Sequence, residues 1–178
     1  GHHAERNRAM GFCLFNNVAV GAAHAMAVHG LERVAIIDFD VHHGNGTEDI
    51  FRNDLRVLMA STFQHPLYPY SGTENPAPNM VNVPLPAGAG SDDFRGAVVD
   101  SWLPALDKHK PELILVSAGF DAHREDPLAG LKLTEADYAW VTHELIKVAA
   151  KHSKRRIVSA LEGGYALSAL GRSAAEHV

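Results

Sequence analysis

The chain has a single cysteine, few aromatic residues and no excess of positive charge, and these absences exclude several classes of protein. With Cys13 alone among 178 residues, no disulfide can form within the chain, which suits a protein of the reducing cytosol. The formal net charge of -5 argues against a nucleic-acid surface, because phosphate binding requires clustered Lys and Arg. We therefore expect a cytoplasmic location and no direct nucleic-acid partner.

Long hydrophobic runs and a signal peptide are also missing, so we expect no membrane contact. A composition of 46% hydrophobic and 21% charged residues is that of an ordinary globular domain. The chain begins Gly1-His2-His3 without Met, which we interpret as a cut inside a longer protein rather than a trimmed tag. We predict a single catalytic domain over residues 1–178, truncated at both ends, and the sequence gives no indication of the oligomeric state.

Apolar, β-branched runs alternate with helical patterns along the chain. The runs predict buried strands at 33–41, 57–62, 112–118 and 156–161, and the helical patterns fall at 16–29, 91–109, 134–152 and 167–178. Residues 63–90 are rich in Pro, Gly and Asn and are predicted to form a long functional loop. Such alternation favours a three-layer α/β/α fold with a mostly parallel sheet.

Each predicted strand ends in polar residues. These ends carry Asp38, Asp40 and His42; Ser61 and Thr62; Asp121 and Asp126; and Gly163, Gly164 and Tyr165. In open α/β sheets the ligand site lies at the carboxyl ends of the strands. We therefore expect all four ends to meet at one crevice.

The first of these ends has the composition of a metal site. Asp38, Asp40 and His42 are spaced by two, so an extended chain points them to one side. Two carboxylates and an imidazole beside a buried strand favour a bound cation. A catalytic zinc takes three protein ligands and an open position, and spacing alone leaves Asp126 and Asp121 as competitors for the third.

Three further residues could act on a substrate at such a metal. His2 and His3 are adjacent, so two imidazoles could serve as base and acid at one site. Tyr165 follows two glycines, and its phenol could donate to a developing oxyanion. Alone, each pattern is weak, because a terminal His pair is commonly a tag and Gly-Gly-Tyr is commonly a turn.

Together these residues resemble the histone deacetylase family, of the arginase-deacetylase fold. The matching motifs are Gly-His-His-Ala at 1–4, Gly-Phe-Cys at 11–13, Asp-Phe-Asp-Val-His-His-Gly-Asn-Gly at 38–46, Ser-Ala-Gly-Phe-Asp-Ala at 117–122, Asp-Pro-Leu at 126–128 and Glu-Gly-Gly-Tyr at 162–165. They occur in the family's order over nearly the whole chain. The details resemble the class II branch and its bacterial relatives, which include acetylpolyamine amidohydrolases.

The resemblance implies a role for each matching residue. It implies Asp40, His42 and Asp126 as zinc ligands, and His2 and His3 as catalytic histidines with Asp38 and Asn45 as their partners. It implies Tyr165 as the oxyanion donor, and Gly11, Phe12, Tyr70 and Leu133 along the acyl-lysine channel. A structural potassium ion is implied as well, at Asp38, Asp40, His42, Ser61 and Thr62.

The reaction implied is zinc-dependent hydrolysis of N-acetyl amides, either acetyl-lysine in proteins or acetylated small amines. Asp38 should keep His2 more basic than Asn45 keeps His3, because a carboxylate favours the charged imidazole and an amide only orients it. Two alternatives remain: an arginase-like ureohydrolase with two metals, and a catalytically silent protein that binds acetyl-lysine.

Overall fold

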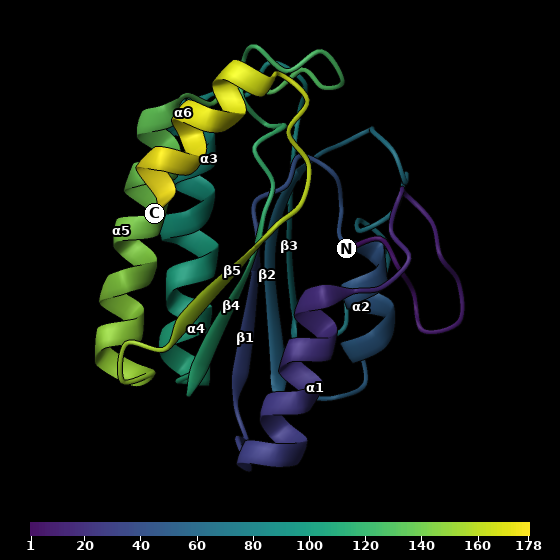
Figure 1. The fold of residues 1–178 in the computed structure, drawn as a ribbon, viewed down its shortest axis with the longest axis vertical. Coiled ribbons are helices and arrows are strands. Elements are labelled where there is room, and N and C mark those ends of the chain that lie inside the picture. The colour runs from purple at the N-terminus through teal and green to yellow at the C-terminus, as the bar shows by residue number, and fades with distance from the viewer.

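A parallel sheet of five strands forms the middle layer in a computed structural model, which describes residues 1–178 (Figure 1). The strands are β1 (Val34–Asp38), β2 (Val57–Gln64), β3 (Met80–Leu85), β4 (Leu113–Ala118) and β5 (Ile157–Leu161). Their order in the sheet is β3-β2-β1-β4-β5, and every neighbouring pair is parallel.

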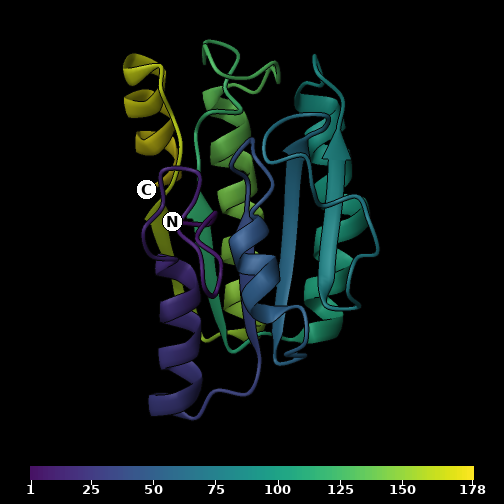
Figure 2. The ribbon, with the colours of Figure 1, turned by 90° about the vertical axis from the view of Figure 1, so that its right-hand side faces the viewer.

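Helices cover both faces of this sheet (Figures 1 and 2). One face carries α1 (Asn17–His29) and α2 (Asn45–Phe51), and the other carries α3 (Ser91–Ala97), α4 (Leu103–His109), α5 (Glu135–His152) and α6 (Leu167–His177). Each face buries its own apolar cluster, the larger lying beneath α3 to α5. The predicted three-layer α/β/α fold is therefore confirmed. None of the helices combines the length and apolarity that crossing a membrane requires.

The strand predictions are confirmed, but two elements were missed. β3 lies inside the predicted 63–90 loop, and α2 follows the Asp-x-Asp-x-His motif. β3 contains Pro84, which an edge strand tolerates because one side needs no ladder partner. Helical structure covers the whole predicted range 91–109, but it consists of three segments: α3, a π-helical turn η1 (Val98–Trp102), and α4.

Helix ends follow the local signals in most cases. Gly30 adopts a left-handed conformation and ends α1, and Thr134 with Asp137 forms a capping box at the start of α5. The cap expected at Ser91 lies one residue earlier, where Asp93 accepts the backbone N–H of Gly90 at 3.0 Å.

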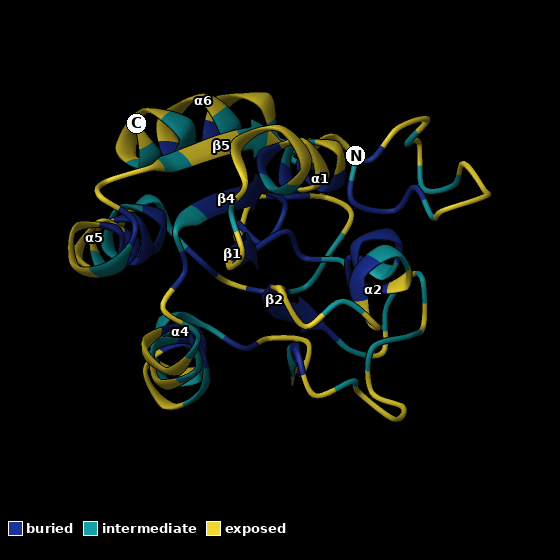
Figure 3. Ribbon diagram, turned by 90° about the horizontal axis from the view of Figure 1, so that it is seen from below, coloured by how far each residue is buried: buried dark blue, intermediate teal, exposed yellow.

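The strand order reverses beside β1. From β1 the chain proceeds to β2 and β3 on one side, then crosses to β4 and β5 on the other. β1 and β2 are buried along their whole lengths, whereas β5 at the edge is partly exposed (Figure 3). A reversal of this kind opens a crevice at the carboxyl ends of the two central strands, here β1 and β4.

Candidate active site

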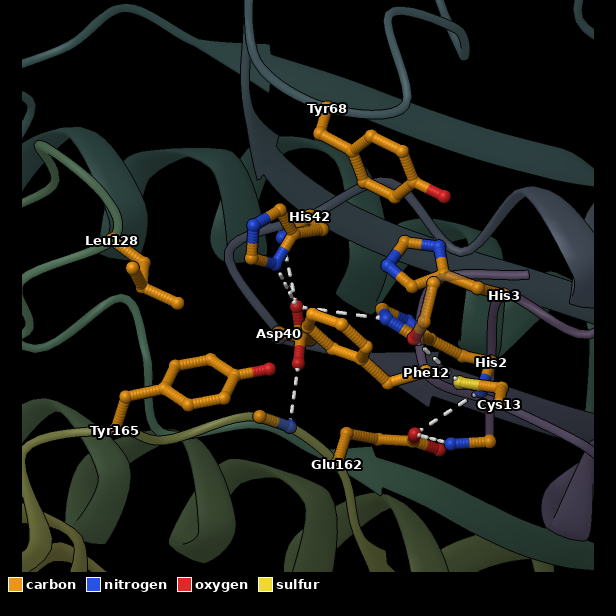
Figure 4. A pocket seen from close by; sticks show the side chains of 13 residues that line it. His2, His3, Phe12, Cys13, Asp40, His42, Tyr68, Leu128, Glu162 and Tyr165 are labelled. Carbon is orange, nitrogen blue, oxygen red and sulfur yellow. Dashed lines mark hydrogen bonds and ion pairs between the residues drawn. The ribbon is translucent and has the colours of Figure 1, made fainter.

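A cavity of about 470 Å³ opens at this crevice (Figure 4). Its wall combines the N-terminal loop with residues that follow β1, β4 and β5. The side chains labelled in Figure 4 are His2, His3, Phe12, Cys13, Asp40, His42, Tyr68, Leu128, Glu162 and Tyr165. Three imidazoles, two carboxylates and two phenols therefore line one cavity.

Asp40, His42 and Asp121 form the only group of three or more His, Cys, Asp or Glu side chains placed to hold a metal ion. One donor atom of each lies within 4.8 Å of the others. His42 Nδ1 lies 3.0 Å from Asp40 Oδ1 and 3.2 Å from Asp121 Oδ2. Asp40 and His42 follow β1 and Asp121 follows the neighbouring β4, so the parallel pairing brings the three together.

Burial and charge make this cluster a receptor for a cation. Burial and the negative charge of Asp40 raise the pKa of Asp121 to about 7. Burial lowers the pKa of the His42 imidazole, but the carboxylates of Asp121 and Asp40 outweigh it and raise that pKa to about 10. Asp121 Oδ2 is buried, and the His42 Nδ1 that lies 3.2 Å away is not oriented to form a hydrogen bond with it. A divalent cation would satisfy this oxygen and offset the repulsion between the carboxylates.

The structure does not place Asp126, the ligand that the resemblance implied, in this cluster. Its Oδ2 accepts the backbone N–H of Tyr165 at 2.8 Å, and its Oδ1 accepts that of Leu128 at 2.9 Å. Both carboxylate oxygens of Asp126 therefore accept hydrogen bonds from the backbone, and Asp126 is not part of the cluster with Asp40 and His42. The structure gathers Asp121 there instead.

His2 and His3 lie side by side above the cluster, with ring centroids 4.1 Å apart. His2 Nδ1 lies 2.8 Å from Asp38 Oδ2, and His3 Nδ1 lies 2.7 Å from Asn45 Oδ1. The structure thus pairs each histidine with the partner that the resemblance implied.

Their partners give the two imidazoles opposite pKa shifts. Burial opposes the charged form of both rings, but the carboxylates of Asp38 and Asp40 outweigh it and raise the pKa of His2 to about 10. Burial and the charge of His2 lower the pKa of His3 to about 4. The order is the one expected from a carboxylate partner and an amide partner. His3 is therefore the member that stays neutral near pH 7.

Tyr165 reaches the cavity from a loop that is held at two points. Gly163 donates its backbone N–H to Asp40 Oδ2 at 2.8 Å, and Tyr165 donates its own to Asp126. Burial and nearby carboxylates, that of Asp121 first, raise the pKa of the Tyr165 phenol to about 12. The phenol therefore remains a protonated donor across the ordinary pH range.

The predicted channel residues divide into two groups. Gly11 and Phe12 line the cavity, whereas Tyr70 does not line it and is 73% exposed, and Leu133 is buried in the core. Neither Tyr70 nor Leu133 is therefore among the residues that line this cavity. Tyr68 and Leu128, which the sequence reasoning missed, do line it.

Gly11 has a specific reason to be glycine. Its φ is +57°, and a Cβ there would overlap the ring of His3. The close approach keeps the loop that carries Phe12 against the imidazole. A larger residue would displace one or the other.

The residues implied for potassium lie at and just past the end of β1 and within the second half of β2. Asp38, Ser61 and Thr62 are buried, and Ser61 Oγ has no hydrogen-bond partner. No other feature of the structure supports an ion at this place, so the potassium site stays a prediction.

The doubly covered parallel sheet carries an acidic cluster at its switch point, and a family match over the whole chain shows that the chain belongs to the histone deacetylase family. A family model described as "Histone deacetylase domain" matches residues 1–178. Among solved structures, the "HDA15 HD domain" superposes with a TM-score of 0.92 at 38% identity, covering 99% of this chain and 52% of that one.

Curated relatives give the same family. "Histone deacetylase 14, chloroplastic" from Arabidopsis thaliana is 43% identical, over 99% of this chain and 43% of its own length. "Histone deacetylase-like amidohydrolase" from Pseudomonas aeruginosa is 42% identical, over 93% of this chain and 45% of its own length. The chain thus spans about half the length of the relatives that it matches.

Proposed function

We propose that the chain carries the metal-binding half of a zinc-dependent hydrolase that cleaves N-acetyl amides of protein lysines or small amines. The observation that carries this proposal is a cavity lined by the His2 and His3 imidazoles, the Tyr165 phenol and two members of the metal-type cluster. Those two members are Asp40 and His42, and the buried Asp121 is the third. An amide hydrolase needs this set, namely a Lewis acid, a base and acid pair, and an oxyanion donor.

The cluster suits zinc by its donors. One imidazole and two carboxylates are ligands that zinc accepts at about 2.0–2.2 Å, with a fourth position left for substrate or water. A zinc ion held by Asp40, His42 and Asp121 would polarise the acetyl carbonyl and lower the pKa of a water molecule towards ~7.

The chain's own residues then move the protons. His3 keeps Nδ1 towards Asn45, which leaves Nε2 to accept a proton from water and deliver it to the departing amine. His2, whose pKa is raised by Asp38, remains charged and stabilises the negative charge that develops at the carbonyl oxygen. The phenol of Tyr165 donates a hydrogen bond to that same oxygen.

Two rival functions have less support. A ureohydrolase of the arginase type needs carboxylates that bridge two metals, and the structure contains one metal-type cluster. A silent acetyl-lysine-binding protein has no use for two histidines and a phenol facing the same cavity.

The domain boundaries, location and substrate belong to the proposal as well. We expect the catalytic domain to continue beyond residues 1–178, and the protein to be cytoplasmic, although two relatives have names that include "chloroplastic". The choice between acetyl-lysine and acetylpolyamine depends on the rim of the cavity.

The test uses the full-length protein. Turnover is measured on an acetyl-lysine peptide, an acetylated polyamine and arginine, before and after removal of zinc by a chelator and its return. We expect hydrolysis of at least one acetyl amide, lost with zinc and restored by it, and none of arginine. Turnover of arginine with two bound metals would support the ureohydrolase, and specific binding without turnover the silent protein.

A further inference from the structure

A line of side chains connects the surface to His3. Arg8 donates to both carboxylate oxygens of Glu5, through Nε to Oε2 at 3.1 Å and through an Nη to Oε1 at 3.0 Å. Glu5 Oε1 also accepts from the amide Nδ2 of Asn45 at 2.8 Å. The other end of that amide, Oδ1, faces His3 Nδ1 at 2.7 Å.

We propose that Glu5 is a positioning residue: by holding the Asn45 amide in one orientation, it fixes the tautomer of His3. This role goes one step beyond the proposed function and rests on it, because it assigns no contact with substrate. Glu5 is partly exposed and lies outside the cavity that His3 lines.

The two ends of the Asn45 amide differ in their hydrogen bonding. An asparagine can present either its oxygen or its NH₂ group to a neighbour. A carboxylate only accepts, so Glu5 selects the orientation in which Asn45 turns its NH₂ outward and its oxygen towards His3. An oxygen facing His3 Nδ1 requires a proton on that nitrogen, which leaves Nε2 as the free base.

The reversed amide would be unfavourable at both ends. Its oxygen would lie against the Glu5 carboxylate, and its NH₂ group would face His3, which would then have to move its proton to Nε2. The other contacts of the Asn45 NH₂ group are weaker: 3.4 Å to the backbone oxygen of His3 and 3.2 Å to Sδ of Met10. A hydrogen bond to a charged acceptor is roughly twice as strong as a neutral one, so Glu5 dominates the choice.

Arg8 completes the arrangement. Its two-pronged contact holds the Glu5 carboxylate in place and balances its charge. His2 has a carboxylate in direct contact, whereas His3 has one that is a full side chain further away. The Glu5–Asn45 contact therefore fixes the orientation of the His3 ring without placing a negative charge beside it, which would favour its protonated form.

The primary test compares Glu5→Ala with Glu5→Gln in the full-length protein. Glu5→Ala removes the acceptor, and we expect kcat to fall about tenfold with KM nearly unchanged, a loss smaller than the roughly 10²–10⁴-fold that a whole general base contributes. Gln keeps an acceptor oxygen, so Glu5→Gln should recover most of this loss. Glu74→Ala, which removes an exposed acid that lines the same surface pocket as Glu5, is the matched control and should leave kcat unchanged.

A second background separates positioning from a general structural effect. In Asn45→Asp there is no amide to orient, and the new carboxylate faces Glu5 at the distance of the present 2.8 Å contact. Adding Glu5→Ala should therefore cause no further loss there and should raise kcat by relieving repulsion. An equal loss from Glu5→Ala in both backgrounds would overturn the proposal.

The tautomer can be read without any turnover. Nitrogen NMR of the ¹⁵N-histidine-labelled protein should show His3 protonated at Nδ1 in the wild type and a mixture in Glu5→Ala. An unchanged His3 spectrum in Glu5→Ala would refute the role of Glu5 whether or not the protein is a deacetylase. A wild type that hydrolyses no acetyl amide would refute the proposed function while this spectrum still decides the role of Glu5.

Discussion

Tyr165 is the residue that best separates an enzyme from a binding protein. Its phenol faces the same cavity as the acidic cluster and the histidine pair, and its pKa of about 12 keeps it protonated. Tyr165→Phe removes one hydrogen bond made mainly in the transition state. Loss of one such donor costs roughly 10²–10³ in kcat, or about 2.7–4 kcal/mol. Affinity for the acetylated substrate should change little, because the donor acts where charge develops.

The assay measures kcat, KM, zinc content and melting temperature for Tyr165→Phe in the full-length protein. Tyr68→Phe is the matched control, since Tyr68 lines the same cavity and packs edge-on against His3 at 5.2 Å between centroids. We expect Tyr68→Phe to stay within about twofold of wild type, because ring packing survives the loss of its hydroxyl. Near-normal kcat in a folded, zinc-loaded Tyr165→Phe would refute the assigned role.

Substitutions at Asn45, Gly163 and Phe12 test other parts of the site. Asn45→Asp adds a negative charge that favours protonated His3 and raises the pKa of its imidazole. Since the base must be neutral, the acidic limb of the profile of kcat/KM against pH should move to higher pH. An unchanged profile would show that His3 is not the titrating group. Gly163→Ala should lower zinc content, because a Cβ there would overlap the carboxylate of Asp121; full zinc occupancy measured by metal analysis would contradict it. Phe12→Ala should raise KM at unchanged melting temperature, because the ring is 96% exposed at the cavity; a lower melting temperature would instead indicate a packing role.

The sequence predicted four of the five strands of the sheet but not the order in which they lie. Periodicity marks a buried strand, and β1, β2, β4 and β5 were all found by it. Which strands are neighbours depends on the crossover connections, and local sequence patterns do not predict these connections. The pairing of β1 with β4 is what brings Asp121 to the cluster.

The choice between Asp121 and Asp126 shows the consequence. Both acids follow the same strand, and both are buried. Asp121 lies three residues past the end of β4 and Asp126 eight, whereas Asp40 lies two residues past the end of β1. The short distance of Asp121 from its strand was the available signal, and it would have favoured Asp121 over Asp126.

The channel residues were missed for a different reason. Tyr68 and Tyr70 are two apart in a loop without periodicity, and only one of them lines the cavity. Leu128 and Leu133 belong to one short irregular segment, yet Leu128 lines the cavity and Leu133 is buried in the core. Side-chain direction in such loops depends on backbone conformation that the residue types do not reveal.

The metal cluster is the central claim, and zinc content measures it most directly. We would compare bound zinc and kcat in full-length Asp121→Asn and Asp126→Asn, with wild type as reference. Asp121→Asn should lose zinc by more than the roughly 10–100-fold in affinity that removal of an outer partner causes, and its activity should fall with it. Asp126→Asn should keep its zinc and lose kcat alone, because Asp126 holds the Tyr165 loop. Zinc lost from Asp126→Asn and retained by Asp121→Asn would contradict the account.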